Sequence, residues 1–425
     1  MHKNKKPEAI LAFIFAAFCT SQWAAALAHQ SDAAQSLQAK FDQTHMPWRG
    51  ADAAYSVPFK DGQIQKSLWL FGDTFIDPRC KGRTDAAFIH NTLAIDTPGQ
   101  TNPRIMAFSK AATAPFADRP DGSFFWPGDG ICINDRFYVF LHRVVGDKSQ
   151  PEPFAFKMVA DEIAVFDLAS AKAAIESGKP IAAHYIDLHN DASKILMGTA
   201  LYRDKDFAYV FARRSSKDAS NRGSTLSRIA LSNLQKSRSL TLADFEWWGG
   251  NDWTVDADKA AVIIADGPSE MSVGTLRGRK GFYALYVPDM AAGGVKALYV
   301  RHADKRIQGP YAKPICLTDL AADHPDSFCY SAKLHPEYAA DDGVAIVTYC
   351  INPTDQKRLI TTTLPIVLVS AVFVCDRATD LLHRLKWCCH YLIDAFLQDD
   401  VLALVVHSQK LLATRQDDDR GPIRG

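Results

Sequence analysis

The feature that most constrains the fold is a short element that occurs five times along the 425 residues. In each copy a polar turn precedes an aromatic-rich apolar strand, as in "GQIQKSLWLFGDTF" at 62–75. The other copies lie at 134–144, 204–215, 279–289 and 341–351. Successive copies start roughly 60–75 residues apart, a spacing that fits four-stranded propeller blades with generous loops.

A second element precedes each copy and predicts the first strand of a hairpin. These segments cover 50–59, 124–133, 194–202, 268–276 and 328–337. Outer strands are predicted between the hairpins, with candidates at 161–168 and 226–234. We therefore predict an all-β fold, a five-bladed β-propeller over residues 46–363. A β-sandwich or an irregular β protein is the alternative.

The first 28 residues have the anatomy of a secretory signal peptide. The cationic start "MHKNKK" is followed by the apolar core "AILAFIFAAFC" and by small residues at Ala26–Ala28. We predict a mature chain that begins near His29, is secreted or periplasmic, and has residues 29–45 as an N-terminal lead segment. An uncleaved membrane anchor is the alternative, which the short apolar core disfavours.

Residues 364–425 do not follow the repeat, and we predict an atypical C-terminal tail there. The apolar stretch at 361–375 is too short to predict a membrane span, so no stable span is expected in the mature chain. Residues 380–400 place apolar side chains on one face of a predicted helix. The Cys, His and Arg content without turn signals is also typical of a shifted reading frame, in which case the last blade would lack its outer strands here.

Composition excludes some partners and leaves others open. The formal net charge is +0, with no basic face, so nothing indicates binding to nucleic acid. No spacing of Cys or His predicts a metal site, and we predict no cofactor.

One disulfide could form among the later cysteines, with pairing undetermined: Cys316, Cys329 and Cys350. The oligomeric state is not predicted.

Acidic residues recur in the predicted first strands, which converge on a propeller axis, and Asp73 closes the second strand of the first hairpin nearby. The candidate catalytic residues are Asp52, Asp73, Asp129 and Glu270. Glycoside hydrolysis needs one protonated carboxyl group to assist the leaving group and one carboxylate to activate water or attack. Neighbouring negative charges raise the pKa of one such group. Each acid also has a structural alternative, such as a turn or a backbone hydrogen bond.

Asp73 differs from the other acids in its position within the repeat. Only the copy at 62–75 ends in Gly-Asp-Thr, so this acid belongs to one blade and not to the repeat. A site role, or support of Asp52, is therefore favoured over a general structural role.

Aromatic and polar residues near these acids are candidates for substrate binding. The predicted contacts are Trp48, Asn91, Trp126, Tyr330, Lys333 and His335, with Trp69, Phe125 and Trp253 as further sugar-stacking candidates. The ordinary alternative for each aromatic or histidine is a place in the core.

The motifs together resemble a family of secreted bacterial five-bladed β-propellers of unknown function that includes endo-D-arabinanases. The resemblance rests on "GADAAYS", "LWLFGDTF", "FWPGDGI", "SEMSV" and "YSAKLHPE", and it covers most of 46–355. It implies an axial pocket in which Asp52, Asp73, Asp129 and Glu270 match the motif acids, and for the arabinanases an inverting mechanism. It does not assign acid and base, and residues 364–425 have no counterpart.

The predicted function is hydrolysis of glycosidic bonds in a polysaccharide, with arabinan-type or other furanosides favoured. A propeller that binds a glycan or another ligand without catalysis is the first alternative. A structural or protein-interaction propeller is the second. Paired carboxylates around an open cleft favour hydrolysis, whereas acids held individually by backbone hydrogen bonds favour a binding protein.

Overall fold

The computed structural model describes ten stretches of the chain. They are 34–41, 46–81, 83–99, 107–108, 113–150, 154–289, 296–339, 344–353, 367–375 and 402–407, with the backbone alone at 107–108, 367–375 and 402–407. The predicted signal peptide (1–28) and the predicted helix at 380–400 lie outside these residues. No helix in the described stretches is both long and apolar enough to cross a bilayer.

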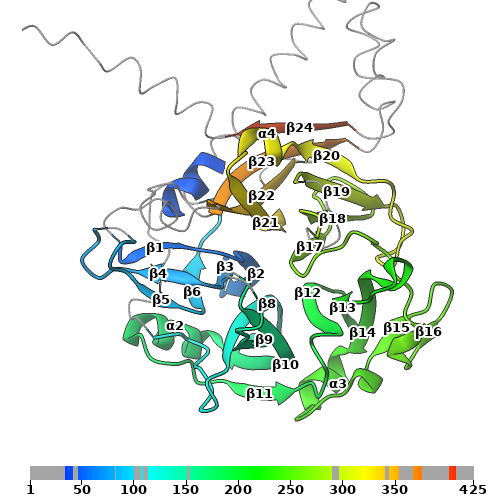
Figure 1. The fold of residues 1–425 in the computed structure, drawn as a ribbon, viewed down its shortest axis with the longest axis horizontal. Helices are drawn as coiled ribbons and strands as arrows, with labels where there is room; N and C mark the ends of the chain where they lie inside the picture. The colour runs from blue at the N-terminus through cyan, green and yellow to red at the C-terminus, as the bar shows by residue number, and fades with distance from the viewer. Residues whose placement is uncertain are drawn as a thin grey trace, which may run out of the picture.

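Five antiparallel sheets of four or five strands surround a common centre (Figure 1). The first sheet contains β2 (Tyr55–Asp61), β3 (Ile64–Phe71), β6 (Thr92–Asp96) and β7 (Ala107–Phe108). The second contains β8 (Phe124–Ile133), β9 (Arg136–Gly146), β10 (Phe156–Asp167) and β11 (His184–Asp187). The third contains β12 (Ile195–Arg203), β13 (Phe207–Arg214), β14 (Gly223–Ala230), β15 (Glu246–Trp248) and β16 (Trp253–Thr254).

The last two sheets complete this series. The fourth contains β17 (Met271–Gly274), β18 (Phe282–Tyr286), β19 (Leu298–Ala303) and β20 (Ile315–Thr318). The fifth contains β21 (Ser327–Leu334), β22 (Val344–Pro353), β23 (Val367–Cys375) and β24 (Leu402–His407). The fifth sheet therefore takes its two outer strands from the segment predicted as an atypical tail. A separate small sheet joins β1 (Trp48–Ala51), β4 (Thr74–Ile76) and β5 (Ala87–Ile89).

The all-β class and the repeated hairpin are confirmed, and the arrangement is that of a β-propeller. Each predicted repeat forms the second strand of a hairpin whose first strand lies nearest the centre: β2, β8, β12, β17 or β21. Strand β9 is buried from Phe137 to His142 without alternation. Neighbouring sheets cover both of its faces, which explains why the repeats read as continuous apolar runs.

Apart from an N-terminal helix at 34–41, the helices among the described residues lie in connections between strands. Helix α2 (Leu168–Ser177) begins at Asp167, whose side chain accepts from Ser170 N, and ends at Gly178 in the left-handed conformation. The predicted outer strand at 226–234 is only partly correct. Strand β14 ends at Ala230, and helix α3 (Leu231–Lys236) buries Leu231 and Leu234.

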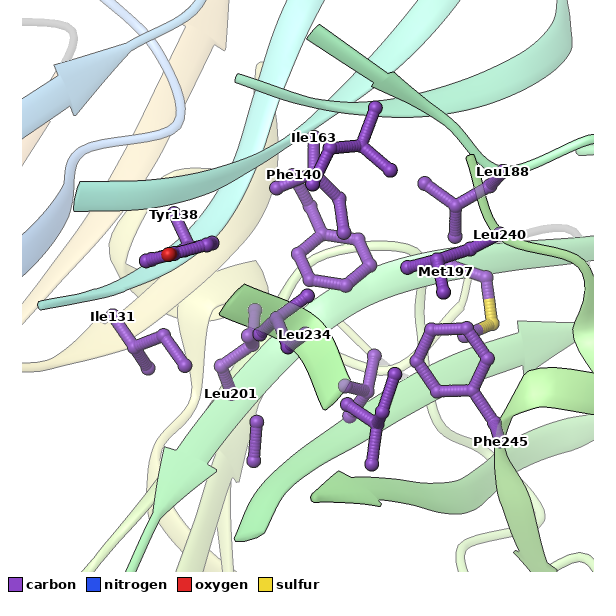
Figure 2. Packing of buried hydrophobic residues seen from close by; sticks show 14 of the residues in the cluster. Ile131, Tyr138, Phe140, Ile163, Leu188, Met197, Leu201, Leu234, Leu240 and Phe245 are labelled. Carbon is purple, nitrogen blue, oxygen red and sulfur yellow. The ribbon is translucent and has the colours of Figure 1, made fainter. Parts of the chain in front are cut away.

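Each pair of neighbouring sheets shares an apolar cluster. The cluster between the second and third sheets combines Phe140, Met197 and Phe245 with other buried side chains, which lie together in Figure 2. Corresponding clusters join the first to the second sheet, the third to the fourth, and the fourth to the fifth. The core is therefore spread between the sheets, which leaves the strand ends nearest the centre available for polar residues.

The first and fifth sheets are joined by side chains and by an N-terminal helix at 34–41 (Figure 1). Lys40 Nζ lies 2.8 Å from both carboxylate oxygens of the buried Asp96. Tyr338 donates its hydroxyl to Asp96 at 2.8 Å and accepts from Trp69 Nε1 at 2.8 Å. This network fixes the fifth sheet against the first and positions both for the site below.

The cysteines that the structure describes do not add covalent bonds to this junction. Cys316, Cys329 and Cys350 lie in the described residues and carry no disulfide. The disulfide considered among them from sequence is therefore not formed.

Candidate active site

Asp52 occupies a tight link between the small sheet and β2. Its N–H donates to Asp73 O at 3.1 Å, and its carbonyl oxygen accepts from Gly72 N at 3.1 Å. The next two residues, Ala53 and Ala54, both have left-handed backbones with φ of 64° and 62°. Such conformations are costly for residues with a Cβ and concentrate at functional sites.

The carboxyl group of Asp52 is held from the fifth sheet. Tyr330 donates its hydroxyl to Asp52 Oδ2 at 2.8 Å and accepts from Asn352 Nδ2 at 2.9 Å. The other oxygen, Oδ1, lies over Gly72, where an added Cβ would come within 2.3 Å of it. A glycine is therefore required beside Asp52 by close approach, which accounts for the Gly72-Asp73 pair in the sequence.

The environment of Asp52 favours its protonated form. Burial raises the pKa of Asp52 well above its ordinary value, and the negative charges of Asp73 and Glu270 raise it further. The hydrogen bond from Tyr330 acts in the opposite direction. Burial and two neighbouring negative charges thus give Asp52 a physical reason to hold a proton.

Asp73 follows β3, and two ring nitrogens lie within hydrogen-bond distance of its carboxylate oxygen Oδ1. Trp126 Nε1 lies 2.7 Å from Asp73 Oδ1, and His90 Nδ1 lies 3.2 Å from the same atom. Thr74 instead bonds Gly72 O and Thr92 within the sheets. Asp73 therefore faces the site, and Thr74 fixes the strand end that carries it.

Glu270 precedes β17 and reaches the site from the fourth sheet. Ser331 Oγ lies 2.8 Å from Glu270 Oε1 and 2.8 Å from Ala53 O, so its single proton can serve one of the two. Lys333 Nζ lies 3.8 Å from the same Glu270 oxygen. Residues from the first, fourth and fifth sheets thus meet at one point.

Lys333 is a buried cation behind this cluster, with its side chain 1% exposed. Its ammonium group lies 4.0 Å from the centre of the Tyr55 ring and donates to Ser331 Oγ at 3.0 Å. Burial lowers the pKa of Lys333, while the nearby negative charge of Glu270 opposes that change. Lys333 is therefore placed to balance the acids, and its burial leaves it little access to a ligand.

Asp129 differs from the other three acids because backbone amides occupy both of its oxygens. Gly130 N donates to Oδ1 and Leu201 N donates to Oδ2, each at 2.7 Å. Asp129 sits where the β8 register shifts between Pro127 and Gly130, and its bond to Leu201 joins β8 to β12. Burial raises the pKa of Asp129 to about 7.

Three predicted binding residues lie in the core. Trp48 packs against Phe41 and Phe71, and Asn91 binds Phe116 through both backbone groups and Phe125 through its carbonyl oxygen. His335 is fully buried, with Nδ1 2.6 Å from Ser56 Oγ and Nε2 2.9 Å from Thr348 Oγ1. Burial lowers the pKa of His335 to about 3, so its ring is neutral at physiological pH. These placements are structural and do not support direct contact with a ligand.

The structure brings together Asp52, Asp73, Glu270, Trp126, Tyr330 and Lys333. The sequence did not identify His90, Ser331 or Asn352, because none belongs to a catalytic motif. Their roles depend on partners more than ten residues away, as in the bond from His90 to Asp73. Among the described residues no group of three or more His, Cys, Asp or Glu side chains could hold a metal ion.

Three carboxyl groups with different surroundings can perform acid–base chemistry. Asp52 is poised to carry a proton, whereas Asp73 and Glu270 present 23% and 27% exposed side chains to the same region. Such a difference between neighbouring acids is what separates a proton donor from a base.

The sequence comparisons assign a family. Residues 35–365 match the family described as "Domain of unknown function (DUF5005)". No curated protein matches the chain.

Solved structures resemble the chain at low identity. A protein from Bacteroides ovatus ATCC 8483, provisionally described as a hydrolase, is 15% identical with a TM-score of 0.57, over 92% of each chain. At that identity the likeness concerns the fold alone. A GH43_1 enzyme from Xanthomonas citri in complex with xylose is 11% identical with a TM-score of 0.40, covering 82% of this chain and 94% of its own. An exo-β-1,3-galactanase from Phanerochaete chrysosporium is 11% identical with a TM-score of 0.39, covering 77% and 68%. These last two likenesses are too distant to carry an argument.

Proposed function

The chain belongs to the DUF5005 family, and we propose that it is an exported, five-bladed glycoside hydrolase-like propeller that cleaves a polysaccharide. The observation that carries this proposal is the meeting of Asp52, Asp73 and Glu270 at the central ends of strands from different sheets. The five four- or five-stranded sheets support the blade count. Arabinan-type and other furanosides are the favoured substrates.

Asp52 is proposed as the general acid. Its pKa is raised by burial and then by the charge of Asp73, so it retains a proton that it can donate to a leaving oxygen. Asp73 then serves to hold Asp52 protonated, because its negative charge raises the pKa of Asp52.

Glu270 is proposed as the base that activates water. It comes from the fourth sheet, and Ser331 and Lys333 orient it from the fifth. A base that approaches from a different sheet than the acid can act on another side of the bound sugar, as water activation requires.

A binding propeller without catalysis is the second candidate. Asp129 favours it, because its two oxygens are already satisfied by Gly130 N and Leu201 N. If the other acids were also held in that way, no carboxyl group would be available for proton transfer.

The test is hydrolysis of arabinans, other furanosides and cell-wall glycans by the purified protein. Asp52→Asn and Glu270→Gln should each lower product release by about 10²- to 10⁴-fold, because each removes one proton-transfer group. Asp61→Asn is the control, since Asp61 lies at the β2–β3 turn and pairs with Lys66 and Lys172.

Equal product release by all variants would reject the proposed site. Binding of a glycan without release of product would favour the second candidate.

A further inference from the structure

We propose that a curved row of ring side chains binds neutral sugar units on both sides of the proposed cleavage point. We call this row the aromatic arc, and its members are His90, Phe124, Trp126, Phe156, Phe154 and Phe328. The ligand class rests on the proposed function, but the surface itself is defined by contacts between rings.

The first half of the aromatic arc crosses from the small sheet to the second sheet. His90 stacks on Phe124 with ring centres 3.6 Å apart and an interplanar angle of 15°. Phe124 lies 5.6 Å from Trp126, and Trp126 lies 4.6 Å from Phe156 in an edge-to-face contact. These distances make the rings one continuous surface.

The second half crosses from the second sheet to the fifth. Phe154, in the connection between β9 and β10, lies 6.4 Å from Phe156 and 5.8 Å from Phe328 in β21. Phe328 lies 4.7 Å from Tyr330, the residue that bonds Asp52. Phe154 therefore links rings of the second and fifth sheets, which lie far apart in the sequence.

Both halves of the arc meet the acids. His90 and Trp126 direct N–H groups at Asp73, while Phe328 packs on the Tyr330 ring whose hydroxyl binds Asp52. The arc is therefore continuous with the candidate active site, and a chain bound along it would pass the carboxyl groups.

The solvent exposure of aromatic rings on and beside the arc is a further observation that favours a ligand-binding surface. Phe154 is 46% exposed, and Phe88, 5.9 Å from His90, is 51% exposed. Of the large apolar side chains recorded as exposed in the described stretches, these two phenylalanines both lie on or beside the arc, whereas Ile64 and Val255 lie elsewhere. Exposed aromatic residues that cluster beside a polar site mark a binding surface.

The charges beside the arc select the kind of ligand. An aromatic face binds an apolar face of a ligand, which a sugar ring presents through its C–H groups. The acids at the site, Asp73 and Glu270, disfavour carboxylated or phosphorylated units, and the nearby Lys333 is only 1% exposed. A neutral glycan chain satisfies both conditions.

The test measures binding separately from hydrolysis. Affinity electrophoresis in gels that contain linear arabinan, neutral galactan or polygalacturonate would use the Asp52→Asn protein as parent, so that the polymer stays intact. Phe154→Ala and Phe328→Ala should each weaken retardation by a neutral polymer roughly 3- to 10-fold. Phe207→Ala is the control, because Phe207 packs on Tyr209 and Arg228 in the third sheet.

The outcomes separate this inference from the proposed activity. Weaker binding in both arc variants supports the arc, even if the wild-type protein releases no product and the hydrolase proposal fails. Variants that migrate like the parent, a parent that no neutral polymer retards, or stronger retardation by polygalacturonate would each overturn the arc. In the first of these cases hydrolysis by the wild-type protein would still support the proposed activity.

Discussion

Two acidic regions of the molecule lie close to its centre and are built differently. At the candidate active site, Asp52, Asp73 and Glu270 are held by side chains such as Tyr330, Trp126 and Ser331. At the junction of the second and third sheets, Asp161 and Asp129 each accept a hydrogen bond from a backbone amide of β12. Met197 N donates to Asp161 at 2.8 Å, and Leu201 N donates to Asp129 at 2.7 Å.

This difference in hydrogen-bond partners distinguishes the candidate active site from what we call the structural joint, formed by Asp129 and Asp161. Backbone amides of another strand cannot leave a carboxylate without disrupting the fold, so these acids tie β8 and β10 to β12. Side-chain partners can adjust when a ligand or a proton arrives. We therefore expect substitutions at the structural joint to change stability and substitutions at the candidate active site to change activity.

The largest expected effect is at Asp161. Its side chain is fully buried and also pairs with His142 at 2.9 Å and with Asn190 at 2.6 Å. Asp161→Ala would leave these donors without their acceptor and should lower the free energy of unfolding by about 3–5 kcal/mol. Urea unfolding measures this loss, with Asp61→Ala as a control at a partly exposed ion pair, which should cost about 0–1 kcal/mol. Similar losses for the two variants would refute the structural joint.

The next effect is a dependence of stability on pH that comes from Asp129. Its pKa is about 7 in the folded state and about 3.9 when unfolded, so the folded protein binds more protons between these values. Stability should therefore fall as pH rises from about 4 to about 7, by up to about 4 kcal/mol. Asp129→Asn should remove this slope, even though the variant is itself weakened by loss of one amide acceptor. Parallel stability curves for the two proteins between pH 4.5 and 7.5 would contradict the assignment.

At the candidate active site, Gly72→Ala should lower the rate of hydrolysis. The added Cβ would lie 2.3 Å from Asp52 Oδ1, so the proposed acid must move. A misplacement of about 1 Å can cost about 10²-fold in rate. The comparison is Gly146→Ala, which meets no atom within 4 Å and should leave hydrolysis unchanged. A Gly72→Ala protein with full activity would remove Asp52 from the mechanism.

The sequence predicted the fold well because its signal is periodic. The hairpins β2–β3 and β8–β9, and those of the later sheets, each pack between two neighbouring sheets. Each therefore carries the same apolar run, which can be recognised in the sequence. The helix α3 was missed because Leu231 and Leu234 carry the apolar pattern on past the end of β14. The outer strands of the fifth sheet were not predicted, since their segment lacks the repeat.

The site was predicted only in part, because the roles of its residues depend on distant partners. Asp52 and Glu270 were identified from their place in predicted first strands, and Asp73 from its place at the end of the second strand of the first hairpin. The sequence could not separate them from Asp129, whose distinction is the amide of Leu201, 72 residues away. Nor could it show that His335 is enclosed by Ser56 and Thr348.

The smallest expected effect is a change of pH profile in Tyr330→Phe. The Tyr330 hydroxyl favours the ionised form of Asp52 and so lowers its pKa, and its removal should raise that pKa. A general acid works only while protonated, so the alkaline limit of hydrolysis should move to higher pH, with the plateau rate falling less than about 10-fold. Tyr338→Phe offers the contrast, because Tyr338 bonds Asp96 at the sheet junction and should lower stability without moving the pH profile. If the acidic limit moves to higher pH in Tyr330→Phe while the alkaline limit stays in place, Asp52 acts as a base, and the roles proposed for Asp52 and Glu270 must be exchanged.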